Sequence, residues 1–325
     1  MLYPLKFKPI FKDKIWGGQK IRTLLKKDFS PLPNCGESWE LSGVEGDVSV
    51  AVNGILAGNS LNELVEIYMG ELVGDKVYEK FGVEFPLLIK YIDASDKLSI
   101  QVHPNDELAK ERHNAYGKTE MWYVVQADKG AELISGFDKT IDQKTYLHHL
   151  ENKSLKSILN NVKVKPGDVF FIPAGRVHAI GGGILLAEIQ QTSDVTYRIY
   201  DWDRLDDKCQ PRELHTELAL EAIDYKGKEE FQREFKPRIN EPMTLAHCDY
   251  FTTNILEFDK IVEKDYSTVD SFVIYMCLSG SITVSGKDFE KVNVKEGETI
   301  LIPAIFDEIT LTPKGKSKIL EIYIS

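Results

Sequence analysis

The chain of 325 residues is long enough to bury a substantial core in one large domain or two ordinary ones. Its net charge of −11 argues against nucleic acid or an anionic membrane surface as the main partner. No secretory signal is evident, and the longest apolar runs are too short to cross a bilayer. The four cysteines form no CxxC pair, which is typical of reduced thiols, and we expect a soluble cytoplasmic protein.

Strand-like segments dominate the chain. They are rich in β-branched and aromatic residues and are bounded by Gly, Pro, Asp or Lys. In chain order they are GDVSVAVNG (46–54), PLLIKYID (86–93), LSIQVH (98–103), EMWYVV (120–125), GDVFFIPA (167–174), GILLAEIQ (183–190), FVIYMCL (272–278), GSITVSG (280–286), ETILIPA (298–304) and KILEIYIS (318–325).

Helical patterns are fewer and lie between these strands. Ser60–Gly82, for example, repeats apolar residues at spacings of three and four after a Ser/Asn start. Many short strands with a few inserted helices favour a β-sandwich or barrel over a doubly wound sheet. We expect helical insertions at about 55–82, 104–117, 140–161 and 211–232.

Two segments of the chain repeat each other. Val164–Gly175 (VKPGDVFFIPAG) is similar to Val294–Ile305 (VKEGETILIPAI), and each follows a strand and a glycine-containing hairpin. This order predicts two related β-barrel units, at 1–240 and 241–325. The first copy continues into His178, whereas the second has no histidine there, so we expect the second unit to lack a site.

Four polar residues form a candidate metal site. Gln101 and His103 are two apart on one strand and therefore face the same side. His178 follows a Pro-Ala-Gly turn, and Glu120 begins the strand EMWYVV. Each residue alone is more often structural or solvated than a ligand. Together, two imidazoles, a carboxylate and an amide oxygen favour a divalent metal such as Zn²⁺.

These residues also carry a family resemblance. GDVFFIPAGRVHAIGG is similar to the second cupin motif, G-x5-P-x-G-x2-H-x3-N, with Gly182 where Asn is usual. The first cupin motif, H-x-H-x3/4-E-x6-G, is present as Gln101-x-His103, a long insertion and Glu120. Together with FPLLIKYIDASDKLSIQVHPND, GKTEMWYV and SDVTYRIYDWDR, these segments resemble the type I mannose-6-phosphate isomerases, especially the short bacterial form.

The resemblance implies both a fold and an activity. The fold is mainly β, with two cupin-like (jelly-roll, double-stranded β-helix) barrels and inserted α-helices, of which the C-terminal barrel is degenerate and lacks a metal site. The activity is the interconversion of D-mannose 6-phosphate and D-fructose 6-phosphate by proton transfer between C1 and C2. One zinc per chain is held by Gln101, His103, Glu120 and His178, and the partner is a small-molecule sugar phosphate.

The resemblance also implies catalytic roles for Lys90, Lys118, Asp194 and Arg198. Lys90 is a cation within an apolar strand, and Lys118 lies two residues before Glu120. Either lysine could attract the phosphate, and Arg198 suits an enediolate or the phosphate. Asp194 is a candidate proton carrier, and the base at carbon stays unassigned. Weaker substrate-contact candidates are Ser99, Trp16 and Glu40.

Two other functions compete with this interpretation. Two histidines and one carboxylate also form the facial triad of non-haem iron oxygenases. A non-catalytic sugar-binding protein could keep the same pocket. Gln101 and the nearby cations favour zinc and a phosphorylated sugar over both. We expect the insertion at 104–117 to form a helical wall or lid at the pocket mouth.

Overall fold

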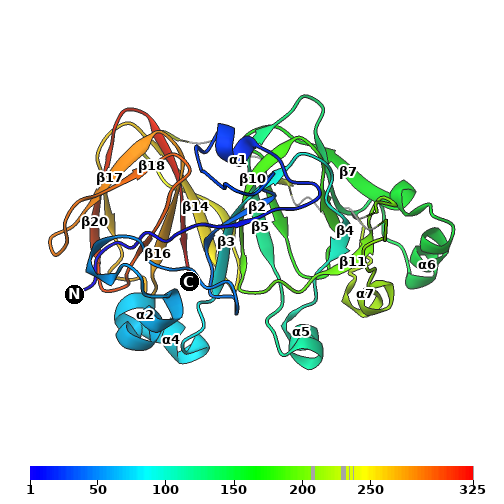
Figure 1. The fold of residues 1–325 in the computed structure, drawn as a ribbon, viewed down its shortest axis with the longest axis horizontal. Helices are drawn as coiled ribbons and strands as arrows, with labels where there is room; N and C mark the ends of the chain where they lie inside the picture. Colours follow the sequence, from blue (N-terminus) through cyan, green and yellow to red (C-terminus); the bar gives the residue numbers. More distant parts are fainter. Residues whose placement is uncertain (206–208, 228–231, 234, 237, 325) are drawn as a thin grey trace.

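The computed structural model describes residues 1–205, 209–227, 232–233, 235–236 and 238–324. The chain is mainly β, as predicted, and its strands form four antiparallel sheets. Two sheets face each other in the N-terminal part and two in the C-terminal part, and the two pairs lie side by side (Figure 1). None of the helices in the described ranges is long and apolar enough to span a membrane.

The first pair of sheets contains the strands that carry the candidate site. The seven-stranded sheet has the order β1 (Ile10–Lys12), β2 (Glu37–Leu41), β3 (Leu87–Ala94), β10 (Ile184–Gln191), β5 (Glu120–Ala127), β8 (Val169–Ile172) and β12 (Gln232–Arg233). The facing five-stranded sheet has the order β11 (Tyr197–Tyr200), β4 (Ile100–Val102), β9 (His178–Ile180), β6 (Glu132–Phe137) and β7 (Leu159–Lys163).

The second pair is built in the same way from the last third of the chain. Its five-stranded sheet has the order β13 (Met243–His247), β14 (Thr252–Phe258), β21 (Ser317–Tyr323), β16 (Val273–Ser279) and β19 (Thr299–Ile302). Its four-stranded sheet has the order β15 (Val262–Asp265), β20 (Glu308–Pro313), β17 (Ser281–Ser285) and β18 (Val292–Lys295).

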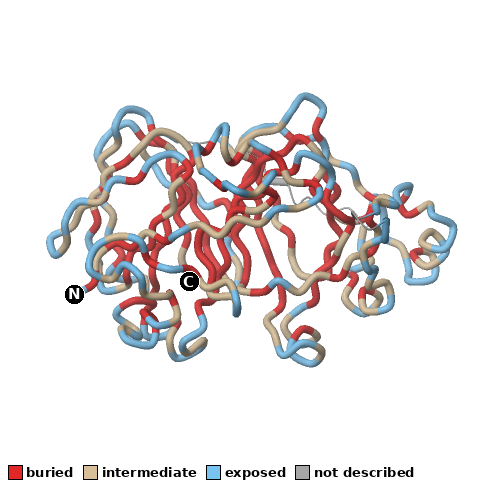
Figure 2. The backbone as a smooth tube through the Cα atoms, viewed as in Figure 1, coloured by how far each residue is buried: buried red, intermediate tan, exposed pale blue. Residues whose placement is uncertain are grey.

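The alternation of side chains along each strand divides the core into separate layers. On β10, Ile184 and Leu186 point between the first two sheets, whereas Leu185, Ala187 and Ile189 point outward. The outward residues pack against the outer face of the sheet that contains β14, β16 and β21, in one continuous apolar core. Figure 2 shows this buried layer at the centre of the molecule. The two halves therefore share a core.

Helices are short and lie outside the sheets. They are α1 (Lys20–Thr23), α2 (Leu61–Tyr68), α3 (Gly70–Val73), α4 (Asp75–Phe81), α5 (Asp106–His113), α6 (Gln143–Glu151) and α7 (Thr216–Ala222), with 3₁₀ turns η1 (Gly54–Leu56) and η2 (Leu155–Ile158).

All four predicted insertions contain helix, but two of the predicted insertions extend beyond the helices that the structure shows. The insertion predicted at 140–161 ends in strand, because Leu159–Lys163 pairs with β6. The one predicted at 211–232 contains α7, and part of it lies outside the described residues. The run predicted as a strand at 46–54 forms only isolated bridges, at Val50 and Ala51.

The predicted helix after Ser60 is broken into three pieces. Ser60 caps α2 through a capping box with Glu63, as its Ser/Asn start predicts. The helix then ends at Met69, whose φ is +46°, and Gly74, with φ +94°, separates α3 from α4. Positive φ values are incompatible with a continuous right-handed helix. The helix is therefore divided at these two residues, although the apolar spacing in the sequence continues across them.

The N-terminal region contacts the C-terminal pair of sheets directly. Leu5 exchanges backbone hydrogen bonds of 2.8 and 2.9 Å with Leu301 on β19. The amide of Ala304 donates to the carbonyl of Leu72, and the amide of Phe272 donates to the carbonyl of Val73. Helices α2 to α4, expected as an insertion of the catalytic unit, therefore border the C-terminal half.

Candidate active site

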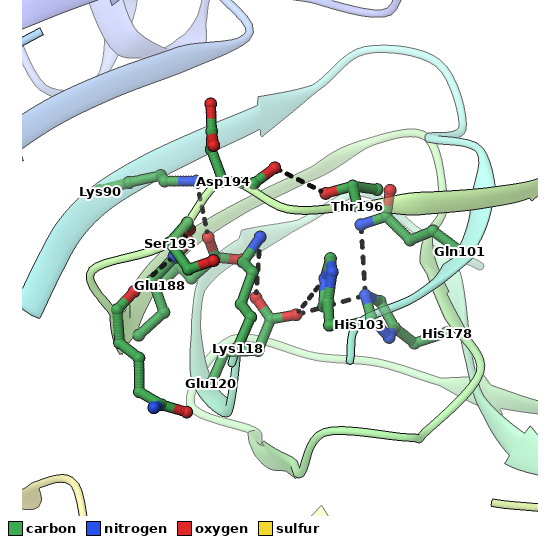
Figure 3. Close-up of polar contacts among 12 residues, drawn as sticks. Lys90, Gln101, His103, Lys118, Glu120, His178, Glu188, Ser193, Asp194 and Thr196 are labelled. Atoms are coloured by element: carbon green, nitrogen blue, oxygen red, sulfur yellow. Dashed lines mark hydrogen bonds and ion pairs between the residues drawn. The ribbon is translucent and has the colours of Figure 1, made fainter. Parts of the chain in front are cut away.

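Strand register brings the predicted site residues together in two facing rows. In the five-stranded sheet of the first pair, Arg198 on β11 lies opposite Gln101 on β4, and Gln101 lies opposite His178 on β9. In the seven-stranded sheet, Lys90 on β3 lies opposite Glu188 on β10. Figure 3 shows Gln101 and His178 of the first row and Lys90 and Glu188 of the second, on opposite sides of the site. Residues far apart in the sequence thus meet because their strands are neighbours.

Three buried side chains form a tight cluster at the inner end of the site. Glu120 Oε1 lies 3.1 Å from His103 Nε2 and 3.3 Å from His178 Nε2. All three side chains are almost fully buried. Within the described part of the chain, this is the one group of three His, Cys, Asp or Glu side chains close enough to hold a metal ion.

Hydrogen bonds to the backbone orient both imidazoles. His103 Nδ1 donates to the carbonyl of Val195 at 2.9 Å, and His178 Nδ1 donates to the carbonyl of Arg176 at 2.8 Å. The Nε2 atoms of the neutral rings then carry lone pairs that face the carboxylate. Burial lowers the pKa of both imidazoles, which keeps them neutral. Although burial opposes its charge, the ammonium group of nearby Lys118 lowers the pKa of Glu120.

This donor set fits a divalent cation. His103 Nε2 and both oxygens of Glu120 are buried and lack a hydrogen-bond partner within the described chain. Lone pairs and a carboxylate at these distances repel one another, and burying them unpaired is costly. A cation between these nitrogen and oxygen atoms binds their lone pairs and removes the repulsion. Nitrogen and oxygen ligands suit zinc.

Gln101 completes the predicted set of four. Its Nε2 donates to His178 Nε2 at 3.2 Å, and its Oε1 lies 3.5 Å from Ser99 Oγ. A 180° rotation of the amide exchanges its oxygen and nitrogen, which directs Oε1 at the cluster. Gln101 is therefore within reach of the group that His103, Glu120 and His178 form.

A chain of alternating charges lies beside the cluster. Lys90 Nζ is 3.1 Å from Glu188 Oε1 and 3.6 Å from Glu37 Oε2, and Glu37 Oε1 is 3.2 Å from Lys14 Nζ. Burial opposes each charge, but Lys90 and Lys14 lower the pKa of Glu37 to about 2, and Glu188 and Glu37 raise that of Lys90. Burial and the carboxylate of Glu120 raise the pKa of Glu188.

Lys118 connects this chain to the metal cluster. Its Nζ lies 3.8 Å from Glu120 Oε2, and the side chain is buried. The lysine lines the cavity together with Lys90 and Glu188. Lys90 and Lys118, both predicted as candidates, therefore converge on one site.

Two arginines occupy the other end of the cavity. Arg198 Nη1 donates to the carbonyl of Glu213 at 2.7 Å, and its Nε is buried without a partner among the described residues. Arg212 Nε donates to Asp201 Oδ2 at 2.6 Å, and Arg212 Nη2 reaches the other oxygen of the same carboxylate. Burial and the nearby charge of Arg212 lower the pKa of Arg198.

The cavity enclosed by these groups has a volume of about 240 Å³. Asp194 lines it and is exposed, and Ser99 and Trp16 line it as well. Glu40, the third weaker candidate, is not among the lining residues and is paired with Lys27 at 2.7 Å instead. The lining residues are Lys14, Trp16, Glu37, Trp39, Lys90, Ile92, Leu98, Ser99, Gln101, Lys118, Ile180, Glu188, Asp194, Thr196, Arg198 and Arg212.

The insertion at 104–117 contains α5 but does not wall this cavity. As far as the structure describes the lining, no residue of that segment belongs to it. The helix instead contacts other parts of the molecule: Arg112 donates to the carbonyl of Leu218, and Asp106 accepts from Tyr250. The expectation of a wall or lid at the pocket mouth was wrong for this cavity.

Several lining residues escaped the interpretation of the sequence. Glu188 is an acidic residue within the apolar strand GILLAEIQ, just as Lys90 is a cation within an apolar strand, and this contrast could have marked it. Glu37 is the first residue of β2, and the four residues that follow it are all buried. Lys14 and Arg212 lie outside named strands, and their place in the cavity depends on the tertiary fold.

The corresponding positions in the second pair of sheets carry different residues. Val273 lies opposite Ile302 as Glu120 lies opposite Ile172. The other correspondences between the two pairs of sheets follow from the paired residues of neighbouring strands. The starting point is Val292, which corresponds to Val162 in the sequence repeat. The replacements are Lys264 for Gln101, Val273 for Glu120 and Ile309 for His178.

A network of polar side chains fills the interior of the second pair of sheets. Glu321, which corresponds to Glu188, contacts Lys264 Nζ at 2.7 Å and accepts from Asn254 Nδ2 at 2.8 Å. Tyr266 donates to the same carboxylate. Charge and hydrogen bonds are thus satisfied by the protein alone.

The paired sheets and the cluster define the class of protein. Residues 241–324 match the family model "Mannose-6-phosphate isomerase, cupin domain", and residues 4–134 match "Phosphomannose isomerase type I, catalytic domain". The chain is thus a mainly β protein with a cupin domain and a group of side chains that could hold a metal.

Comparison with known proteins narrows this class. The chain is 41% identical to mannose-6-phosphate isomerase ManA of Bacillus subtilis over 258 residues, covering 77% of this chain and 78% of the relative. It is 34% identical to mannose-6-phosphate isomerase of Streptococcus mutans over 304 residues, covering 93% of each. A crystal structure of mannose 6-phosphate isomerase from Bacillus subtilis matches with a TM-score of 0.85 at 30% identity over 99% of both chains. The chain therefore belongs to the type I phosphomannose isomerase family, and it is an aldose–ketose isomerase.

Proposed function

We propose that the protein is a zinc-dependent enzyme that interconverts D-mannose 6-phosphate and D-fructose 6-phosphate through an enediol-type intermediate. The observation that carries this proposal is that His103 Nε2 and both Glu120 oxygens are buried without a hydrogen-bond partner among the described residues, next to a cavity lined by five cationic side chains. Neither the oxygenase nor the non-catalytic alternative agrees with the family to which the chain belongs.

Gln101, His103, Glu120 and His178 would hold the zinc ion. When bound, zinc polarises the sugar carbonyl or binds the hydroxyls, and so stabilises charge on oxygen. The strand positions of Gln101 and His178, directly opposite each other, support their action as a pair.

The protein's own residues supply the remaining requirements of the reaction. Lys118, beside Glu120, donates hydrogen bonds to the sugar oxygens between which the proton moves. Lys90 is held in its charged form by Glu188 and Glu37, and it lines the cavity as a cationic hydrogen-bond donor to the substrate. Arg198 stabilises the negative charge of the enediolate, and Asp194 at the rim carries a proton or orients a cation.

The charges of the cavity support a phosphate site at the arginine end. Lys14, Lys90 and Lys118 each lie near a carboxylate, so the inner end is close to neutral before zinc binds. At the other end, Arg212 uses its Nε and Nη2 for Asp201. The Nη1 side of its planar fork is not used by that carboxylate and matches a phosphate in shape and charge.

We also propose that each pair of sheets is a cupin-like barrel, with the division at 1–240 and 241–325. The repeat of sequence, strand order and register supports this. The second barrel has lost the metal site, because Lys264, Val273 and Ile309 replace three of the four ligands. An ammonium group and its carboxylate partner fill that interior.

The proposal is tested by metal analysis coupled to an activity assay. Protein purified without added metal is analysed for zinc, and isomerisation of fructose 6-phosphate is measured before and after chelation. We expect one zinc per chain, loss of activity on chelation, recovery on adding zinc and no oxygen consumption. Full activity after complete zinc removal would refute the metal's role.

A further inference from the structure

The backbone around Lys118 is held by an unusually complete set of hydrogen bonds. The amide of Gly117 donates to Asp106 Oδ1 at 2.8 Å, that of Lys118 to the carbonyl of Pro104 at 3.1 Å, and that of Thr119 to Gln191 Oε1 at 2.8 Å. Three consecutive amides are thereby fixed immediately before Glu120. The backbone is thus held on both sides of Lys118, whose side chain lines the cavity.

Asp106, the first residue of α5, is the centre of this network. Besides Gly117, its Oδ1 accepts from Gln191 Nε2 at 2.9 Å. Its Oδ2 accepts from the Tyr250 hydroxyl at 2.7 Å. One carboxylate therefore joins the start of the helix, the segment that carries Lys118 and the loop between β13 and β14.

The fit around Gly117 shows that this contact leaves little space. A Cβ at Gly117 would lie 2.6 Å from the backbone of Asn105 and Asp106. Even alanine at this position would force the backbone to shift. The segment 104–117 thus brings its own helix N-terminus back against the residue that precedes Lys118.

We propose that Asp106 is a positioning residue for Lys118 and that Tyr250 supports it from the C-terminal half of the chain. This inference rests on the proposed role of Lys118 in the reaction. It gives the long insertion between Gln101 and Glu120 a function other than covering the pocket: the insertion supplies the carboxylate that orients the lysine.

The test is a double-mutant cycle on the full-length, zinc-loaded enzyme, with kcat and KM for fructose 6-phosphate as readouts. Asp106→Ala is expected to lower kcat about 10- to 100-fold, because a shift of about 1 Å in a reacting group has this effect. Asp106→Asn keeps an acceptor oxygen and should recover most of the activity. In a Lys118→Met background, Asp106→Ala should cause less than about a twofold further loss.

Two more variants separate positioning from general destabilisation. Glu107→Ala, an exposed neighbour on the same helix, is the matched control and should keep wild-type kcat. Tyr250→Phe removes one hydroxyl and is expected to lower kcat about 2- to 30-fold. Zinc content and thermal unfolding are measured for every variant, so that a variant that fails to fold or bind metal is recognised. If Asp106→Ala fails in this way, Asp106→Asn is compared with the wild type instead.

The inference and the proposed role of Lys118 fail in different ways. Wild-type turnover in Lys118→Met alone would overturn the proposed role of that lysine. Wild-type kcat in Asp106→Ala, or an equal fold loss on adding Asp106→Ala to the wild type and to Lys118→Met, would overturn the positioning role of Asp106. Unchanged kcat in Tyr250→Phe would remove Tyr250 from the network.

Discussion

At the scale of single residues, the site is organised by buried charges that each have a defined partner. Glu37 illustrates the energetic consequence. Its pKa of about 2 lies below the ordinary value of 4.5, so the folded state binds its proton less tightly than the unfolded state does. Ionised Glu37 therefore stabilises the fold above about pH 4.5, and this contribution is lost as the pH falls toward 2.

We predict that Glu37→Gln lowers the free energy of unfolding at pH 6 by up to ~3 kcal/mol, the value of a shift of this size. The difference from the wild type should shrink as the pH falls toward 3. Urea unfolding at several pH values measures this, with exposed Glu45→Gln as the control. A difference that stays constant with pH would contradict the role of the Glu37 charge.

Arg212 provides a second prediction at this scale. If its free edge binds the phosphate, Arg212→Ala should raise KM for mannose 6-phosphate at least about tenfold, with a smaller change in kcat, because a hydrogen bond to a charged group contributes about 1.5–3 kcal/mol. Inhibition by inorganic phosphate should weaken in parallel. Arg204→Ala removes the other arginine on Asp201 and serves as the comparison. Unchanged inhibition by phosphate in Arg212→Ala would place the phosphate elsewhere.

The sequence predicted individual residues where one side chain contradicted its surroundings. His178 was found as a histidine after a proline-glycine turn, whereas Lys90, a cation in an apolar strand, was singled out through the family resemblance. Arg198 and Asp194 came from family resemblance alone. Arg212 carries no local signal, because its approach to the cavity depends on Asp201 and on how the loop after β11 folds back.

At the scale of elements, a contact from a distant segment replaces the local cap of helix α4. Helix α4 begins after Gly74, which has no side chain to cap it. Instead, Asp270 accepts from the amide of Asp75 through Oδ1 at 2.7 Å and from that of Lys76 through Oδ2 at 3.1 Å. A carboxylate from just before β16 therefore caps the helix and complements its dipole.

We predict that Asp270→Ala destabilises the protein by about 1–2 kcal/mol, as loss of a helix N-cap does. The kinetic constants should stay at wild-type values, because α4 does not line the active-site cavity as described. Thermal unfolding and a standard assay measure both effects, with exposed Asp288→Ala as the control. A large fall in kcat with unchanged stability would contradict this assignment.

The sequence predicted which segments form strands more reliably than it predicted which strands pair with each other. Alternating and apolar runs at 86–93, 120–125 and 183–190 correspond to β3, β5 and β10. That Glu188 would lie opposite Lys90 depends on register, which no single strand encodes. The helix expected through Ser60–Gly82 was divided because local φ values at Met69 and Gly74 overrode a continuous apolar pattern.

At the scale of the whole molecule, the shared core makes the two halves dependent on each other. Leu87, Ile89 and Tyr91 of β3 are fully buried, in the same core cluster as Ile274 and Ile322 of the C-terminal half. Removal of residues 241–325 would expose this face to water. Apolar surface of this kind drives association or loss of structure.

We predict that a fragment of residues 1–240 does not unfold cooperatively and binds a hydrophobic dye. The full chain should unfold cooperatively and should not bind the dye. Circular dichroism during heating and dye fluorescence measure this. The full chain with Val273→Ala, which alters the C-terminal core but keeps both halves, is the control. A fragment with a cooperative transition and bound zinc would show that the catalytic half folds alone.

The pairing of Leu5 with Leu301 has a consequence for synthesis of the protein. The two residues are separated by 296 positions, yet they exchange two backbone hydrogen bonds. A ribosome adding about 5–20 residues per second delivers the second roughly 15 to 60 s after the first. The N-terminal segment that contains Leu5 therefore lacks this partner until nearly the whole protein has emerged. Chaperones that bind such a segment would act on this enzyme mainly during that interval.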